Sequence, residues 1–171
     1  MIIYRCKISG DELFSDAFEP MIVKEDFFYE IEGKNISVSN KIDESAIGAN
    51  ASAEEAAEGQ EDLVETKINV IYSHKLQETS FDKKGFQTFI KEYIKVLLAK
   101  IEEEKGKEAA DEFKKRAATG VKKVLENFKN WQFFQGENMA DGGMIVLMDY
   151  REDGVTPYFW FVKDGIIAEK Y

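Results

Sequence analysis

Few residues of this sequence are of the types that catalyse reactions or hold transition metals. The chain contains one histidine, His74, and one cysteine, Cys6. Ser-His-Asp and Cys-His catalysis need a histidine beside a nucleophile, and neither residue lies in a recognisable nucleophile motif. A closed zinc site usually draws four ligands from Cys and His, which this chain cannot supply. We therefore expect no catalytic residues, no zinc and a non-enzymatic function.

Carboxylates are the other residues that could do chemistry. Asp11, Glu12 and Asp16 lie close together near the start of the chain, and calcium takes six to eight oxygen ligands. They predict a weak calcium site, although there is no EF-hand spacing and an acidic surface facing water explains the same pattern. Glu12 and Glu137 lie at predicted turns, and Glu137 follows the aromatic pair Phe133-Phe134. Acids in such positions either anchor a basic partner or simply face water.

Lysines are concentrated in one part of the chain. Residues 82–130 contain 13 Lys or Arg and nine Asp or Glu, a net charge of +4, whereas the whole chain carries −10. We predict that Lys91, Lys95, Lys122 and Lys123 belong to a basic face that binds an acidic protein surface. The alternative is an ordinary solvated helix face, because several glutamates interrupt the positive charge.

Two amphipathic helices must carry these lysines. Apolar residues recur at spacings of three and four over 86–101, which predicts a helix with an N-cap at Ser80 and an end at Gly106. A second such pattern over 110–128 predicts another helix, weakened in its middle by Gly120. Because the connection is short, the two helices should form an antiparallel hairpin.

Strands are predicted on both sides of the hairpin, with a tight Asp-Gly turn at 151–154 between the last two long ones. They cover 1–8, 27–31, 63–76, 144–150 and 157–162. Between 42 and 67 the chain has eight Asp or Glu and no Lys or Arg, which predicts a mobile acidic loop, bounded at 39–66, because like charges repel and little apolar area can be buried. This order of elements predicts an α+β fold with an antiparallel sheet.

Length and composition set broader limits. The 171 residues suit one domain, 1–171, that includes the acidic loop and a helical hairpin over 80–130. A net charge of −10 argues against nonspecific binding to nucleic acid. No apolar stretch approaches the ~18 residues that cross a bilayer, and no secretory signal begins the chain. With a single cysteine as well, we expect a soluble cytoplasmic protein with no membrane or nucleic-acid partner.

Several segments resemble the translationally controlled tumour protein family, also called histamine-releasing factor or fortilin. Residues 47–55 (IGANASAEE) are similar to the first family signature. Residues 128–138 (FKNWQFFQGEN), continuing to Tyr150, are similar to the second. Further family blocks are found at 11–16, 74–81 and 149–158, so the resemblance covers essentially the whole chain.

The resemblance implies an α+β fold with a tent-like antiparallel β core, similar to an exchange-factor relative that binds small GTPases, together with a projecting helical hairpin and a disordered acidic loop. It implies a multifunctional cytoplasmic protein that supports growth and survival and also leaves cells by a non-classical route. Implied ligands and partners are calcium, tubulin and microtubules through the basic helical region, a Rheb-type small GTPase, a translation elongation factor and anti-apoptotic proteins.

The resemblance also implies roles for single residues. Glu12 occupies the position to which the family's GTPase interaction is attributed, and Glu137 belongs to the second signature. Guanine nucleotide exchange, or another regulation of a Rheb-type GTPase, is therefore the alternative function. The metal-binding cysteines of the exchange-factor relative have no counterpart here, and the chain ends in Tyr171 rather than the terminal cysteine of some relatives, so we expect no structural zinc and mostly a monomer.

Overall fold

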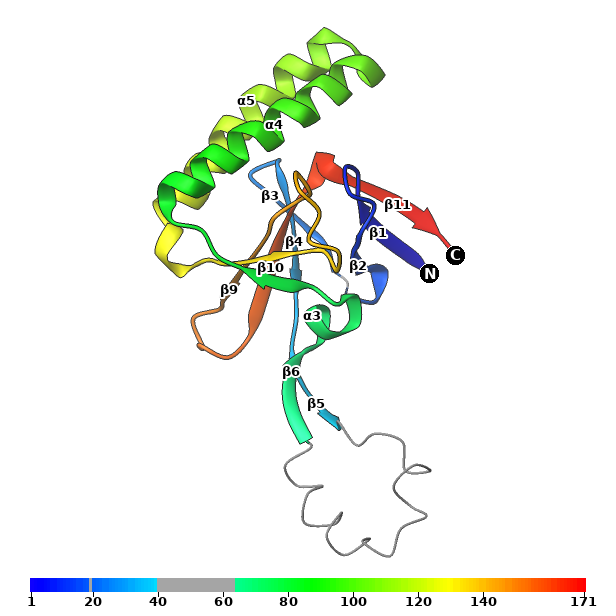
Figure 1. Ribbon diagram of the computed structural model, residues 1–171, viewed down its shortest axis with the longest axis vertical. Helices are drawn as coiled ribbons and strands as arrows, with labels where there is room; N and C mark the ends of the chain where they lie inside the picture. Colours follow the sequence, from blue (N-terminus) through cyan, green and yellow to red (C-terminus); the bar gives the residue numbers. More distant parts are fainter. Residues whose placement is uncertain (19, 40–63) are drawn as a thin grey trace, which may run out of the picture.

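The fold is a set of antiparallel sheets crossed at one end by a long helical hairpin (Figure 1). A computed structural model describes residues 1–18, 20–39 and 64–171. Among these residues the strands form a three-stranded, a six-stranded and a two-stranded sheet. The predicted α+β class with an antiparallel β core and a helical hairpin is confirmed.

The six-stranded sheet forms the centre of the molecule. Its strands, in spatial order, are β3 (Ile22–Lys24), β4 (Phe28–Glu32), β10 (Pro157–Val162), β9 (Val146–Tyr150), β8 (Gln132–Gln135) and β7 (Gln77–Thr79). Strand β10 is covered on both faces, because Phe159 and Phe161 are fully buried and the intervening Trp160 is nearly so. The sheet therefore supplies the core against which the other elements pack.

The smaller sheets flank this core. The three-stranded sheet has the order β11 (Ile166–Lys170), β1 (Ile2–Cys6) and β2 (Glu12–Ser15), followed by the short 3-10 helix η1 (Asp16–Phe18). The two-stranded sheet pairs β5 (Asn35–Ser39) with β6 (Val64–Ile68) and projects from the end opposite the helical hairpin (Figure 1). Because 64–66 pair with 37–39, the predicted loop bounds of 39–66 were too wide, and residues 40–63 lie outside the described residues.

The predicted strand over 63–76 is wrong beyond Ile68. The chain there forms the helix α3 (Asn69–His74) and then β7. The Asn69 side-chain oxygen accepts hydrogen bonds from the N–H groups of Lys34, at 2.9 Å, and Val70, at 2.8 Å, and so fixes the start of α3. Lys75 ends the helix in the left-handed conformation at φ 53°. A side-chain hydrogen bond across 35 residues is not visible in strand periodicity.

The helical hairpin consists of α4 (Lys83–Lys105) and α5 (Lys107–Glu126), joined at Gly106. The buried side of α4 follows the predicted spacing, with Phe86, Ile90 and Tyr93 in its first half. The N-cap is Asp82 rather than Ser80, because the Asp82 carboxylate accepts a 2.7 Å hydrogen bond from the Gly85 N–H.

Gly120 has a packing role in α5. A Cβ at this position would lie 2.5 Å from Cδ2 of the fully buried Phe27. The helix therefore needs glycine there to approach the loop before β4. Among the described residues, no helix is both long and apolar enough to cross a membrane.

Candidate functional sites

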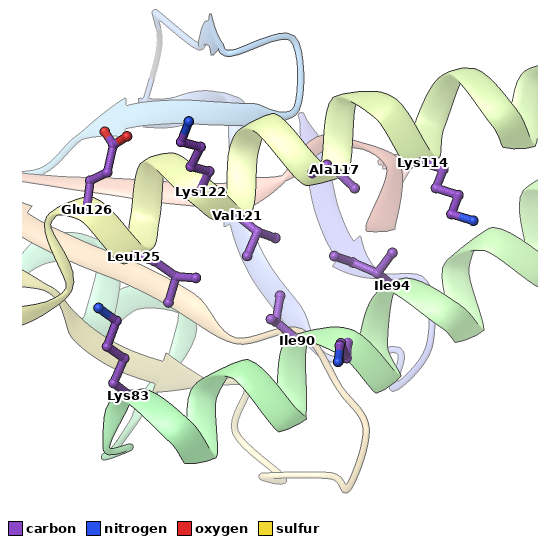
Figure 2. Close-up of a pocket in the computed structure, with 11 residues that line it drawn as sticks. Lys83, Ile90, Ile94, Lys114, Ala117, Val121, Lys122, Leu125 and Glu126 are labelled. Atoms are coloured by element: carbon purple, nitrogen blue, oxygen red, sulfur yellow. The ribbon is translucent and has the colours of Figure 1, made fainter.

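A groove runs between the two helices of the hairpin (Figure 2). It encloses about 620 Å³. Its floor is apolar and is formed by Ile90 and Ile94 of α4 with Ala117, Val121 and Leu125 of α5, which point toward one another across the groove. Ile90 and Ala117 are buried, whereas Ile94, Val121 and Leu125 are only partly covered. The hairpin thus leaves apolar surface exposed on the face that the sheet does not cover.

Lysines surround this apolar floor. Lys83 and Lys91 of α4 and Lys114 and Lys122 of α5 line the groove, with Glu126 at one end. No described residue forms a salt bridge with any of the four lysines, and all four are exposed. Their ammonium groups are therefore free to pair with an external anion.

The predicted basic face is divided by the groove. Lys91 and Lys122 line it, whereas Lys95 and Lys123 are exposed on the same helices but do not line it. The apolar floor was not recognised from the sequence, since Ile94, Val121 and Leu125 fit the pattern of a buried helix face. The spacing by itself gives no signal for this partial exposure, because a broad apolar stripe is also typical of a helix that packs against a core.

Antiparallel pairing also concentrates charge. Residues 83–95 of α4 lie beside 114–126 of α5, and together they carry nine Lys or Arg and two Asp or Glu, a net charge of +7. The rest of the hairpin, 96–113, carries three Lys and six Asp or Glu, a net charge of −3. The modest net charge of the hairpin therefore results from a strongly cationic part and an acidic tip.

A second cluster surrounds Glu12, the first residue of β2. Its carboxylate lies 3.6 Å from Nη2 of Arg5 on the neighbouring strand and 3.4 Å from Nδ1 of His74 at the end of α3. The Glu12 side chain is still 42% exposed. Glu12 is thus held by two partners and remains accessible to a third.

Glu137 lies close to the same cluster. Its carboxylate is 3.7 Å from Nζ of Lys75, the residue after His74. Gly136 packs directly on Asp11, where a Cβ would clash, and Nδ2 of Asn138 donates a 2.6 Å hydrogen bond to the Asp11 carboxylate. The structure therefore brings the segments that carry Glu12 and Glu137 together, joined through the end of α3.

The partners of these two glutamates were not found from the sequence. Arg5, His74 and Lys75 are separated from them by between seven and 62 positions, and no periodicity links such residues. His74 is 7% exposed, with the Phe18 ring edge-on at 5.6 Å. Burial lowers the pKa of His74, and the neighbouring Glu12 carboxylate partly opposes this shift.

The predicted calcium ligands do not assemble into a site. Among the described residues, no group of three or more His, Cys, Asp or Glu side chains is arranged to hold a metal ion, so Asp11, Glu12 and Asp16 do not form one. Asp11 is buried against Asn138, and Glu12 faces two basic groups. Asp11 and Glu12 therefore already have protein partners.

Comparison with known proteins matches the whole chain to one family. Residues 1–167 match the translationally controlled tumour protein family. A translationally-controlled tumor protein homolog from Branchiostoma belcheri is 52% identical over 171 residues, covering 100% of both chains. The Homo sapiens translationally-controlled tumor protein is 48% identical over 172 residues, covering 99% of both.

Solved structures agree with this match. The translationally controlled tumor-associated protein p23fyp from Schizosaccharomyces pombe is similar with a TM-score of 0.82 and 44% identity, covering 100% of both chains. The translationally-controlled tumor protein from Caenorhabditis elegans gives 0.72 and 34% identity. Sequence and fold thus agree over the full length, and the chain belongs to the translationally controlled tumour protein family.

Proposed function

We propose that this chain is a non-enzymatic cytoplasmic binding protein that uses the cationic part of its helical hairpin to bind acidic segments of partner proteins, the acidic tails of tubulin in microtubules among them. The observation that carries the proposal is the charge of +7 gathered over 83–95 and 114–126 in a chain whose total is −10. Local charge of one sign steers an oppositely charged partner toward the surface that carries it.

The experiment is co-sedimentation with microtubules at low and high salt. Reversal of Lys91, Lys95, Lys122 and Lys123 to Glu should weaken binding about tenfold, because each exposed pair contributes modestly and four are removed. The matched control reverses four exposed lysines away from this surface, namely Lys34, Lys105, Lys107 and Lys170.

The control carries the same change in net charge. If both quadruple variants lose binding equally, association follows net charge and the proposed surface is wrong. Undiminished binding by the first variant would also overturn the proposal. Addition of salt should weaken wild-type binding, since exposed charges are screened beyond ~8 Å at physiological ionic strength.

A second candidate function is regulation of a Rheb-type small GTPase. The placement of Glu12 and Glu137 beside adjacent residues, His74 and Lys75, supports it. Exchange needs no acid-base chemistry in the regulator, because stabilising the nucleotide-free GTPase is sufficient. Release of fluorescent GDP from such a GTPase should be accelerated by wild type and not by Glu12→Val.

Glu169→Val is the matched control for this experiment. Glu169 also pairs with Arg5, at 3.0 Å, but lies on β11. If exchange survives Glu169→Val and is lost in Glu12→Val, the effect belongs to Glu12 itself and not to the release of Arg5. Release no faster than the intrinsic rate with wild type would exclude this function.

A further inference from the structure

We infer that the groove between α4 and α5 docks an acidic amphipathic helix of a partner protein, which completes a three-helix bundle. This inference rests on the proposed function and specifies its partner, because a cationic surface alone would accept any acidic segment. The apolar floor, the length of the groove and the placement of the lysines support such a ligand (Figure 2).

The floor requires an apolar ligand. Ile94, Val121 and Leu125 are partly exposed along the seam between the two helices. A purely acidic tail would cover these side chains with polar groups and gain little binding free energy. A ligand with an apolar stripe would instead remove them from water. Two packed antiparallel helices with such a seam present the surface into which the ridge of a third helix fits.

The length of the groove fits a short helix. Along α4 the lining extends from Lys83 to Ile94, and at 1.5 Å per residue this spans about 17 Å. That length corresponds to about three helical turns, which would present apolar residues at positions i, i+4 and i+7 to the floor. The inferred ligand is therefore a helix of about 12 residues.

The lysines determine the polar face of the ligand. Lys83 and Lys91 line the groove from α4, and Lys114 and Lys122 line it from α5, so acids on both flanks of the apolar stripe would meet a lysine. The four lysines have no salt-bridge partner among the described residues, so no internal pair has to break on binding. Glu126 is the one acid in the lining.

The test uses three fluorescent peptides of 14 residues that carry the same net charge. The first has Leu at i, i+4 and i+7 with Glu and Gln elsewhere, the second has the same composition with the Leu residues distributed around the helix, and the third has no Leu. Fluorescence anisotropy with the full chain should show that the first binds at least about tenfold more tightly than either of the others. Equal affinity for all three, or no binding of the first, would overturn the inference.

Two pairs of variants locate the site. Lys91→Glu with Lys122→Glu should weaken binding of the first peptide about tenfold, whereas Lys95→Glu with Lys123→Glu, on the same helices but outside the groove, should weaken it less than threefold. Val121→Asn should abolish the preference for the first peptide, and Val96→Asn, at an exposed position of α4 outside the groove, should not. Circular dichroism melts verify that the compared variants are folded.

The outcomes separate this inference from the proposed function. If both lysine pairs weaken peptide binding equally, a diffuse basic face binds the acidic ligand and the docking groove is wrong, while the microtubule result still stands. If the microtubule experiment fails and the first peptide still binds in the groove, the proposed tubulin partner is wrong and the docking site remains.

Discussion

Tyr93 carries a buried hydroxyl group that does not stabilise the folded state. The residue is 2% exposed, and its hydroxyl has no hydrogen-bond partner among the residues that the structure describes. The ring lies against Gly165, where a Cβ would clash with the hydroxyl. Burial raises the pKa of Tyr93 well above its ordinary value, so the group remains neutral.

We predict that Tyr93→Phe leaves the free energy of unfolding unchanged or raises it by up to about 1 kcal/mol, because an unsatisfied buried hydroxyl is removed at nearly constant shape. Urea denaturation measures this. Tyr158→Phe is the control, since the Tyr158 hydroxyl donates a hydrogen bond to Asp149 and its loss should lower stability. A loss of more than about 1 kcal/mol in Tyr93→Phe would show that the hydroxyl has a partner.

The environment of His74 predicts how the free energy of unfolding depends on pH. Its folded pKa is lowered from 6.5, so the unfolded chain binds the proton more tightly. The free energy of unfolding should therefore be greatest above pH 6.5 and fall as the pH drops from 6.5 through the folded pKa. Because His74 is the one histidine in the chain, its ring proton resonance gives this pKa directly by NMR.

Glu12→Gln should lower the pKa of His74 further, since the carboxylate that favours the imidazolium is removed. Glu137→Gln should leave it unchanged, because Glu137 pairs with Lys75 instead. A rise in the pKa of His74 in Glu12→Gln would contradict the contact between Glu12 and His74.

Among the elements, α5 contains a position, Gly120, at which intrinsic helix propensity and tertiary contact favour different residues. Gly120 in the interior of a helix costs about 1 kcal/mol relative to Ala. The Phe27 ring leaves no room for a methyl group there, with its Cδ2 atom 2.5 Å from the position of a Cβ. The contact with Phe27 favours glycine at this position, because displacing a buried aromatic ring costs more folding free energy than placing a glycine inside a helix.

Gly120→Ala should therefore destabilise the protein by about 1 to 3 kcal/mol, the usual cost of overpacking. Thr119→Ala, at the exposed neighbouring position, is the control and should be neutral or slightly stabilising. Thermal unfolding of both variants measures the difference. A more stable Gly120→Ala would mean that Phe27 moves aside at little cost.

The groove is also a property of paired elements. α4 alone predicts an amphipathic helix with lysines beside an apolar stripe, and α5 predicts another. The exposed seam exists only because the sheet covers one side of the pair and leaves Ile94, Val121 and Leu125 partly open on the other. Partial exposure of this kind depends on packing angle and cannot be read from spacing.

At the scale of the whole molecule, a net charge of −10 coexists with a surface of opposite sign. An acidic partner is repelled at long range by the total charge and attracted at short range by the cationic part of the hairpin. Moderate salt screens the long-range repulsion first, because the Debye length falls from about 30 Å at 0.01 M to about 10 Å at 0.1 M.

We therefore predict that the association rate with the acidic helical peptide depends less steeply on salt between 0.01 and 0.1 M than between 0.1 and 1 M, concentrations at which the Debye length is about 30, 10 and 3 Å. Stopped-flow fluorescence measures the rate. The variant with Lys34, Lys105, Lys107 and Lys170 reversed, whose total charge is more negative, should show a rate that rises with salt in the lower range. A steep and uniform decrease with salt in both proteins would show that the total charge has no influence.

Local sequence patterns are sufficient to predict the fold class, the two helices and the excess of lysine that these helices carry. These properties follow from local periodicity and from residue counts, and both can be read from the sequence without knowing any tertiary contact. The wrong predictions at Ser80 and at 63–76 have a similar cause, since at each boundary a side-chain oxygen, of Asp82 or of Asn69, accepts hydrogen bonds from backbone N–H groups. Such hydrogen bonds can end a helix or strand where the apolar periodicity continues, and they depend on which backbone group lies near the side chain.

Which charged residues share a surface depends on contacts between elements that are distant in the chain. Glu12 meets His74 across 62 residues, and 83–95 meet 114–126 because the chain reverses at Gly106. It also separated Lys91 and Lys122 from Lys95 and Lys123, which the sequence treats alike. The physical reason is that coulombic and apolar contacts act through distances in space, and these are set by packing between elements that local sequence does not encode.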